Sequence, residues 1–403
     1  MARVLVAALV AMIIAILSGP TFISFLRKNE FGQHIREEGP QTHLAKQGTP
    51  TMGGLLFLLA AAIAFLPLSD YTLPALTVFG TAVACGVVGF LRKNEFGQHI
   101  REEGPQTHFA KQGTPTMGGL LILLAATIAF LPLSDFTLPA LTVFGTAVAC
   151  GVIGFLDDFI KLRHKRSLGL RGRWKMLMLL GITAAVGMAA HHQHLSHHVY
   201  VPVADFSIPL GPVWYGLLFL IIAGAVNGVN LTDGVDGLAA GTSIIALATL
   251  TAMAVTIFIR SATPTHGRVQ NRLDVAFIGA ALIGAAIGFL WFNAHPAEVF
   301  MGDTGAFALG GAIAAMAIMM KVELLLLLVG GIFATTSLSV ILQVASFKYW
   351  GRRIFLMAPL QHHFEMKAWS ETKIMVRFWI VTAILCAAGF ALFYKYFLQF
   401  RGV

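Results

Sequence analysis

Charged side chains are scarce in this sequence. Lysine, arginine, aspartate and glutamate together make up 12% of the 403 residues, whereas hydrophobic residues make up 57%. A water-soluble globule of this size needs more polar side chains than that to cover its surface. The composition therefore excludes a soluble protein and places the chain in a lipid bilayer.

Cysteine is equally scarce, with three residues in the whole chain. Cys85, Cys150 and Cys386 all fall inside apolar runs. At such positions cysteine behaves as a small buried hydrophobe, so we expect neither a disulfide framework nor a reactive thiolate.

Apolar runs of about 20 residues, the length that crosses a bilayer as a helix, recur between short polar loops. They are rich in leucine, alanine, isoleucine and glycine and lack the alternation of a barrel strand. The sequence therefore predicts an all-α fold, a polytopic transmembrane bundle in which residues 1–403 form a single domain of about twelve spans. The expected spans are 2–24, 53–68, 73–90, 118–133, 138–156, 175–190, 211–229, 238–259, 275–293, 304–320, 322–343 and 374–396.

The chain also contains an internal repeat, because residues 25–89 recur as residues 90–154. Each copy consists of one polar loop followed by a helical hairpin. A hairpin crosses the membrane twice, so the extra copy does not change the orientation of later segments. A recent tandem duplication and a join of two related copies both explain the pattern. The five pairs that differ are Leu44/Phe109, Phe57/Ile122, Ala62/Thr127, Tyr71/Phe136 and Val88/Ile153.

Most lysine and arginine residues lie in loops that follow alternate spans. By the positive-inside rule these loops face the cytoplasm. The exceptions on the outer side are Arg260, Arg268 and Arg272. The cytoplasmic residues include Arg27, Lys28, Arg36, Lys46 and their copies, then Lys161, Arg163, Lys165, Arg166, Arg171, Arg173, Lys175, Lys348, Arg352, Arg353 and Lys367.

The first polar cluster is the pair Asp157 and Asp158, which we expect to end an apolar helix, with Lys161 one turn beyond. A carboxylate pair at a membrane face suits Mg²⁺, which prefers oxygen ligands and keeps other positions for phosphates. The alternative is a helix-end charge pair solvated by lipid headgroups, and for an isolated Asp-Asp pair that alternative is favoured.

Two further clusters are rich in amides and carboxylates. In residues 227–237 we expect interleaved glycines to break the helix, so that Asn230, Asp233 and Asp236 can bond a base or ribose. An ordinary loop with Asx turns is the alternative. In residues 292–303, Asp303 begins a span, where its desolvation implies a function. It could also serve as the helix N-cap, and the two roles can coexist.

The fourth cluster, residues 358–365, holds His362 and His363 on the last large cytoplasmic loop. Paired histidines can bind phosphate, ligate a metal or relay protons. Adjacent histidines are nevertheless more often ordinary surface residues.

Together with residues 111–119, these four clusters resemble the phospho-N-acetylmuramoyl-pentapeptide transferases of the polyprenyl-phosphate N-acetylhexosamine-1-phosphate transferase superfamily. The resemblance implies that Asp157, Asp158 and Asp303 are essential acids that hold Mg²⁺, with Asp303 as the first choice of direct ligand. His362 and His363 belong to the block specific to this branch. Two departures from the family pattern are Gln361 in place of a first histidine and Thr336 in place of an acid. The other implied active-site residues are Lys111, Thr116, Lys161, Asn230, Asp233, Asp236, Asn293 and Phe300.

The resemblance also implies the reaction. A member of this family moves phospho-N-acetylmuramoyl-pentapeptide from UDP to undecaprenyl phosphate, which gives lipid I and UMP at the cytoplasmic face of the bacterial inner membrane. We then expect a ten-span core plus one duplicated hairpin, the bilayer as partner and no nucleic acid, while a homodimer stays open. The alternatives are an N-acetylglucosamine-1-phosphate transferase, a membrane transporter and an inactive paralogue.

Overall fold

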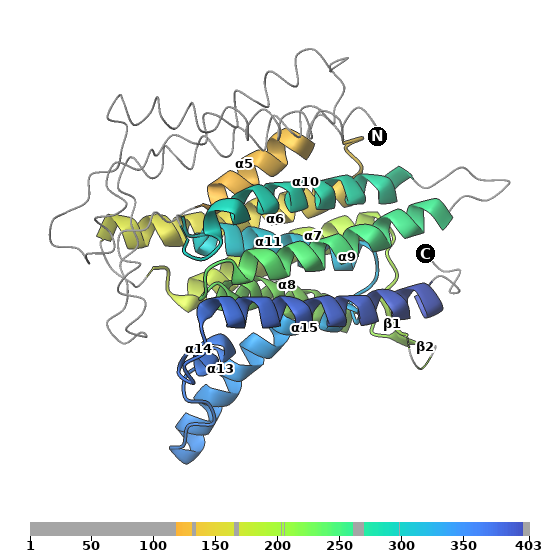
Figure 1. Cartoon of the computed structure of the whole chain (residues 1–403). Coiled ribbons are helices and arrows are strands. Elements are labelled where there is room, and N and C mark those ends of the chain that lie inside the picture. Colours follow the sequence, from red (N-terminus) through yellow and green to blue (C-terminus); the bar gives the residue numbers. More distant parts are fainter. Residues whose placement is uncertain are drawn as a thin grey trace, which may run out of the picture.

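The computed structural model of the chain describes residues 118–130, 134–164, 169–202, 204, 206–260, 270–297 and 299–397. Within these ranges the chain forms a bundle of helices with one two-stranded antiparallel hairpin (Figure 1). The elements are α5 (Gly119–Phe130), α6 (Leu138–His164), α7 (Gly172–His192), β1 (His198–Val201), β2 (Phe206–Pro209), α8 (Val213–Thr232), α9 (Leu238–Arg260), α10 (Gln270–Asn293), α11 (Gly302–Met319), α12 (Leu326–Val329), α13 (Gly331–Trp350), α14 (Leu360–Glu365), α15 (Glu371–Leu392) and the π-helical turn η2 (Phe393–Phe397).

Eight of these helices are long and apolar enough to cross a membrane. They confirm the predicted all-α polytopic fold. The expected span 118–133 corresponds to α5, which has 12 residues in the described part of the chain. The three spans expected at 2–24, 53–68 and 73–90 lie outside the described residues, so the full count of twelve stays a prediction.

Two predicted boundaries are wrong. The apolar run 322–343 does not form one span, because α12 ends at Val329 and α13 begins at Gly331, with Gly330 between them. Two consecutive glycines weaken a helix at that point. Asp157 and Asp158 do not end their helix either, since α6 continues to His164. An ion pair between Asp157 and Lys161, one helical turn apart, favours this continuation.

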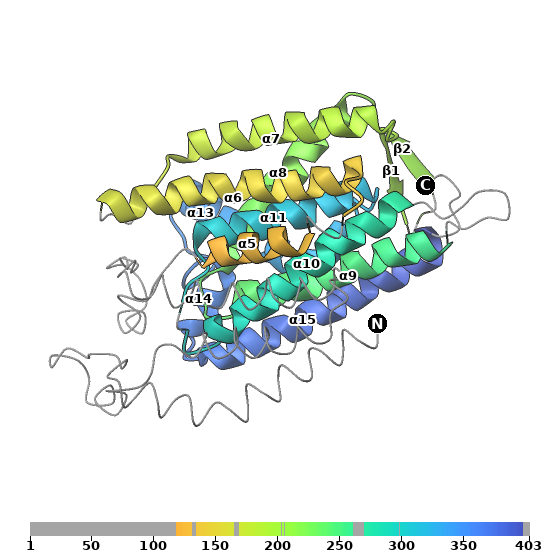
Figure 2. The same ribbon diagram turned by 90° about the horizontal axis from the view of Figure 1, so that it is seen from above.

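Helix α11 is the centre of the bundle and packs against α5, α6, α8 and α9 (Figure 2). In it 94% of the spanning residues are buried, compared with 28% in α7. Its glycines allow this close packing, as small residues do between helices in a membrane. A Cβ atom at Gly305, Gly310 or Gly311 would lie within 3 Å of α5, α8 or α6, respectively.

The hairpin of α5 and α6 is fixed to α10 by a buried acid. The carboxylate of Asp274 accepts hydrogen bonds from the backbone N–H groups of Asp135 and Thr137 and from the hydroxyl groups of Ser134 and Thr137. All these donors lie in the turn between the two helices. The carboxylate therefore accepts the hydrogen bonds of the polar groups in the turn where α6 begins.

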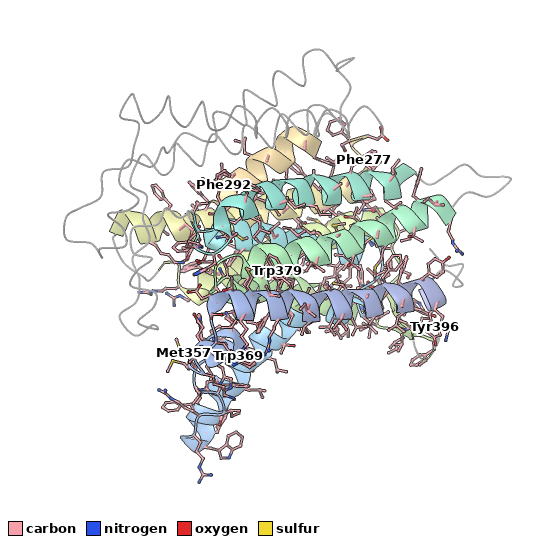
Figure 3. The ribbon with its side chains drawn as sticks, in the orientation of Figure 1. Phe277, Phe292, Met357, Trp369, Trp379 and Tyr396 are labelled. Carbon is pink, nitrogen blue, oxygen red and sulfur yellow. The ribbon has the colours of Figure 1, made fainter. Side chains whose placement is uncertain are left out.

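The last helices carry the chain away from the bundle and back along it (Figure 1). Helix α13 leads away from the other helices, and α14 and α15 return the chain to them (Figure 1). Trp379 of α15 lies beside α9, where it contacts Gly241. Phe292 and Trp369 mark one end of the bundle and Tyr396 marks the opposite end (Figure 3). The C-terminus of α10 and the N-terminus of α15 therefore lie at the same end.

The packing around α11 predicts that Gly310→Ala destabilises the protein. The new Cβ atom would lie 2.7 Å from the Cα atom of Val226 and 2.8 Å from the carbonyl oxygen of Ala225, and backbone atoms cannot move aside cheaply. Overpacking of this kind costs about 1–3 kcal/mol. We expect a lower melting temperature in detergent for this variant.

The matched control is Gly224→Ala in α8, where a Cβ atom would meet nothing within 4 Å. Alanine favours a helix over glycine, so this variant should melt at the same temperature as the wild type or higher. Equal melting temperatures for the two variants would show that the backbones are not in contact at Gly310.

Candidate active site

Three carboxylates meet at one end of the bundle. Asp157 and Asp158 come from α6, and Asp303 comes from the first turn of α11. Each offers an oxygen atom, and these atoms all lie within 4.8 Å of one another. The structure therefore brings together the three acids that the sequence resemblance singled out as metal ligands.

Two lysines bridge this cluster. The Nζ atom of Lys161 lies 2.6 Å from Asp157 Oδ2 and 3.2 Å from Asp303 Oδ1. The Nζ atom of Lys175 lies 3.1 Å from Asp157 Oδ1 and 2.9 Å from Asp303 Oδ2. Like charges so close together repel strongly away from water, and the ammonium groups offset that repulsion.

Lys175 was not among the individual site residues that we predicted from the sequence. It lies in the first turn of α7, on the side of the bundle where α6 ends. The connection between the two helices is short, and its backbone also contributes, since the N–H of Leu170 donates to Asp157 Oδ1 at 2.6 Å. Because this connection is short, a lysine at the start of the span after an Asp-Asp motif must lie near the aspartates. Lys175 could have been recognised in this way.

Asp158 holds the N-terminus of α11. Its two carboxylate oxygens accept hydrogen bonds from the backbone N–H groups of Asp303 at 3.1 Å and Thr304 at 2.9 Å, and from the Thr304 hydroxyl at 2.7 Å. The N-cap residue Met301 makes no side-chain capping bond. A carboxylate from α6 thus caps α11, where the helix dipole favours a negative charge. Asp303 is not the N-cap, so that alternative interpretation was wrong.

The second polar cluster joins the first through Asn230, whose Nδ2 donates to Asp303 Oδ1 at 2.9 Å. The predicted helix break is shorter than expected, because α8 continues to Thr232 and the chain turns only over residues 233–237. The last of these, Gly237, adopts a left-handed conformation with φ of 74°. Asn230 therefore projects from a regular helix and not from a loop.

The short loop after α8 carries Asp233 and Asp236. Desolvation and the negative charges of Asp303 and Asp158 raise the pKa of Asp233 to about 8, which favours its protonated form. In that state it can donate a hydrogen bond. A divalent cation bound at the neighbouring aspartates would lower this pKa again.

Asn293 connects this loop to the segment that precedes α11. Its Oδ1 accepts from the N–H of Gly237 at 3.0 Å, and its Nδ2 donates to the carbonyl of Val299 at 2.9 Å. The side chain is buried. Phe300, in the same segment, accepts a hydrogen bond at its carbonyl oxygen from the N–H of Gly118. Lys111 and Thr116, which precede Gly118, lie outside the described residues.

The histidine block on α14 contacts the same loop. Gln361, which stands where the family has a histidine, donates from Nε2 to the carbonyl of Leu231 at 2.6 Å. The ring of His362 lies against Gly234, and its Nδ1 pairs with Glu365. His363 accepts from the N–H of Leu356 at 3.1 Å and contacts Phe355. Desolvation and the nearby Lys367 lower the pKa of His363.

Among the described residues, two groups of side chains could hold a metal ion. One consists of Asp157, Asp158 and Asp303, and the other of Asp236, His295 and Glu371. The first offers carboxylate oxygens only, which matches the preference of Mg²⁺. The second includes a histidine nitrogen, which Mg²⁺ seldom uses. Of the two groups, the three aspartates therefore have the donor set that suits an oxygen-preferring cation better.

The sequence matches two models of known proteins. The model for glycosyl transferase family 4 matches residues 140–321, which include the aspartates and the loop after α8. Signature 1 of phospho-N-acetylmuramoyl-pentapeptide-transferase matches twice, at residues 46–58 and 111–123, once in each copy of the repeat.

Curated relatives that carry the name phospho-N-acetylmuramoyl-pentapeptide-transferase align over most of the chain. The protein of Halalkalibacterium halodurans is 46% identical over 298 residues, which cover 73% of this chain and 88% of the relative. That of Geobacillus kaustophilus is 47% identical over 307 residues, covering 75% and 90%. That of Frankia alni is 43% identical over 330 residues, covering 78% and 93%. The chain belongs to the phospho-N-acetylmuramoyl-pentapeptide-transferase family.

Proposed function

We propose that this enzyme transfers phospho-N-acetylmuramoyl-pentapeptide from UDP to undecaprenyl phosphate, so that lipid I forms and UMP leaves. The observation that carries the proposal is the convergence of three carboxylates and two lysines at one end of the membrane bundle. A phosphoryl-transfer site consists mainly of such charge-stabilising groups. The relatives' name gives the group that is transferred, and the sequence resemblance implies the nucleotide sugar and the lipid phosphate as the two substrates.

Magnesium is the proposed cofactor, with Asp303 as direct ligand and Asp157 and Asp158 as further ligands. When bound, Mg²⁺ would neutralise charge on the diphosphate of the nucleotide sugar. Asp158 also keeps Asp303 in place through its bonds to the start of α11. The oxygen-only donor set fits this ion, and the three side chains come from two helices that are packed tightly together.

The chain's own cations would bind the anionic substrates. Lys161 and Lys175 each reach Asp157 and Asp303 and can turn their ammonium groups to phosphate oxygens, as flexible lysines do. Asp157 would either remove the proton of the attacking lipid phosphate or, in a two-step route, attack the sugar-linked phosphorus itself, so that UMP leaves before the lipid phosphate displaces the carboxylate. We propose His362 and His363 as further catalytic groups, and Thr116, Asn230, Asp233, Asp236, Asn293 and Phe300 as substrate-binding residues.

The proposed location is the bacterial inner membrane, with the site on the cytoplasmic face. Basic residues are concentrated near the aspartates, as the positive-inside rule requires of a cytoplasmic end. A nucleotide sugar from the cytosol and a lipid phosphate from the bilayer can both reach such a site. The described basic residues near the ends of α6, α7 and α13 and in the connections that follow α6 and α13 are Lys161, Arg171, Arg173, Lys175, Lys348, Arg352, Arg353 and Lys367.

The release of UMP by purified protein tests the proposed function. We expect release with UDP-N-acetylmuramoyl-pentapeptide plus undecaprenyl phosphate, and none with UDP-N-acetylglucosamine. Removal of divalent ions with EDTA should stop the reaction, and Mg²⁺ should restore it. Release with UDP-N-acetylglucosamine alone would replace the proposal with the related N-acetylglucosamine-1-phosphate transfer. No release from either sugar would reject both.

The two copies of the repeat differ in whether they can contribute residues to the active site. We propose that the second copy, whose hairpin is α5 and α6, is the one that does. Gly118 and Gly119 donate to the carbonyls of Phe300 and Met301, directly before α11. Ile122 is fully buried there, whereas the first copy has the larger Phe57. Only the second copy leads into Asp157, so Lys111 would reach the substrate phosphates and Lys46 would not.

Lys46→Ala and Lys111→Ala form a matched pair, because the two lysines lie in nearly identical local sequences. We expect Lys111→Ala to lose most UMP release and Lys46→Ala to keep it. Deletion of residues 25–89 should also preserve activity, since it removes a whole hairpin and leaves the later orientation unchanged. Loss of activity in Lys46→Ala instead would place the first copy at the site.

A further inference from the structure

A second cluster of ionisable side chains lies beside the loop that follows α8. His295 Nδ1 is 3.1 Å from Asp236 Oδ2 and 3.5 Å from Glu371 Oε2. The three residues come from the loop between α8 and α9, the segment before α11, and the first turn of α15. The Asp236 side chain is 3% exposed and that of Glu371 is 12% exposed, whereas His295 is 36% exposed.

Hydrogen bonding explains this cluster better than a bound metal does. Asp236 Oδ2 accepts from the backbone N–H of Ala297 at 3.1 Å as well as from His295. Both lone pairs of that oxygen are then directed at hydrogen-bond donors. Because Asp236 and Glu371 both present acceptor oxygens, the hydrogen of the His295 ring belongs on Nδ1.

The cluster lies where three segments of the chain are held together. Asn293 already ties the start of this segment to Gly237. His295 and Ala297, on the same segment, hold the neighbouring Asp236. Glu371, in the first turn of α15, contacts His295 and so connects α15 to the same cluster. A carboxylate held by two donors on one oxygen has its plane fixed, so its other oxygen points in one direction.

We propose that His295 is a positioning residue that orients the Asp236 carboxylate for binding the uridine part of the nucleotide substrate. This inference rests on the proposed function, which assigns Asp236 to substrate binding. A carboxylate only accepts hydrogen bonds, and uridine offers donors at its ring N–H and its ribose hydroxyls. Without His295, Asp236 loses one of the two donors that hydrogen-bond to Oδ2, so its carboxylate is held less firmly and uridine binding weakens.

The test compares His295→Ala with His295→Asn, with Mg²⁺ present throughout. An asparagine Nδ2 can replace the Nδ1 donor of histidine, whereas alanine cannot. We expect His295→Ala to raise the KM for the nucleotide sugar about tenfold, as the loss of a hydrogen bond to a charged group does. Its kcat should stay within roughly twofold of the wild type, because ground-state and transition-state binding are lost equally.

His295→Asn should recover most of the affinity, and His192→Ala, an exposed histidine at the far end of α7, should match the wild type. Calorimetric binding of UMP should show the same order of affinities.

An unchanged KM and UMP affinity in His295→Ala, or a loss confined to kcat, would overturn the inference. Zn²⁺ that raises the melting temperature of the wild type but not of His295→Ala would replace it with a metal site. A wild type that binds UMP but never releases it from a nucleotide sugar would reject the proposed function, while the calorimetry would still decide the role of His295.

Discussion

The contact between Asp158 and the start of α11 is the constraint on which the site depends. Helix α11 is buried on nearly all sides, so its N-terminal N–H groups have little access to water. Unsatisfied backbone donors in such a place are costly, and Asp158 supplies their acceptor from a neighbouring helix. Because Asp303 itself donates one of these bonds, the same contact places its side chain beside Asp157. A structural requirement of the central helix thus assembles the acidic cluster.

Charge balance then determines what the cluster can bind. When ionised, three carboxylates and two ammonium groups leave these five groups with one excess negative charge. Two unit charges about 4 Å apart interact by roughly 4 kcal/mol at the effective dielectric constant of a protein surface. The site therefore favours another cation, while Lys161 and Lys175 remain available to phosphate oxygens. Asn230 donates to Asp303 and fixes that carboxylate further.

The sequence was sufficient to predict the features that follow from local chemistry. Continuous apolar runs predicted the spans because a bilayer requires internally bonded helices. The sequence also placed Lys161 one turn beyond Asp157, and the structure shows an ion pair between them. Features that depend on distant contacts were not predictable. Asp158 and Thr304 are 146 positions apart in the chain, and nothing local to either one indicates their hydrogen bond. His295 was missed for the same reason, and the helix break at Gly330 was hidden by the apolar residues around it.

The position of a bound divalent cation tests this account most directly. Mn²⁺ can replace Mg²⁺ at oxygen ligands, and its anomalous scattering locates it in a crystal structure. The account predicts one Mn²⁺ ion coordinated by Asp303 and at least one of Asp157 and Asp158, and no Mn²⁺ in a crystal of the Asp303→Asn variant. Mn²⁺ bound instead among Asp236, His295 and Glu371, or retained at the aspartates in Asp303→Asn, would contradict it.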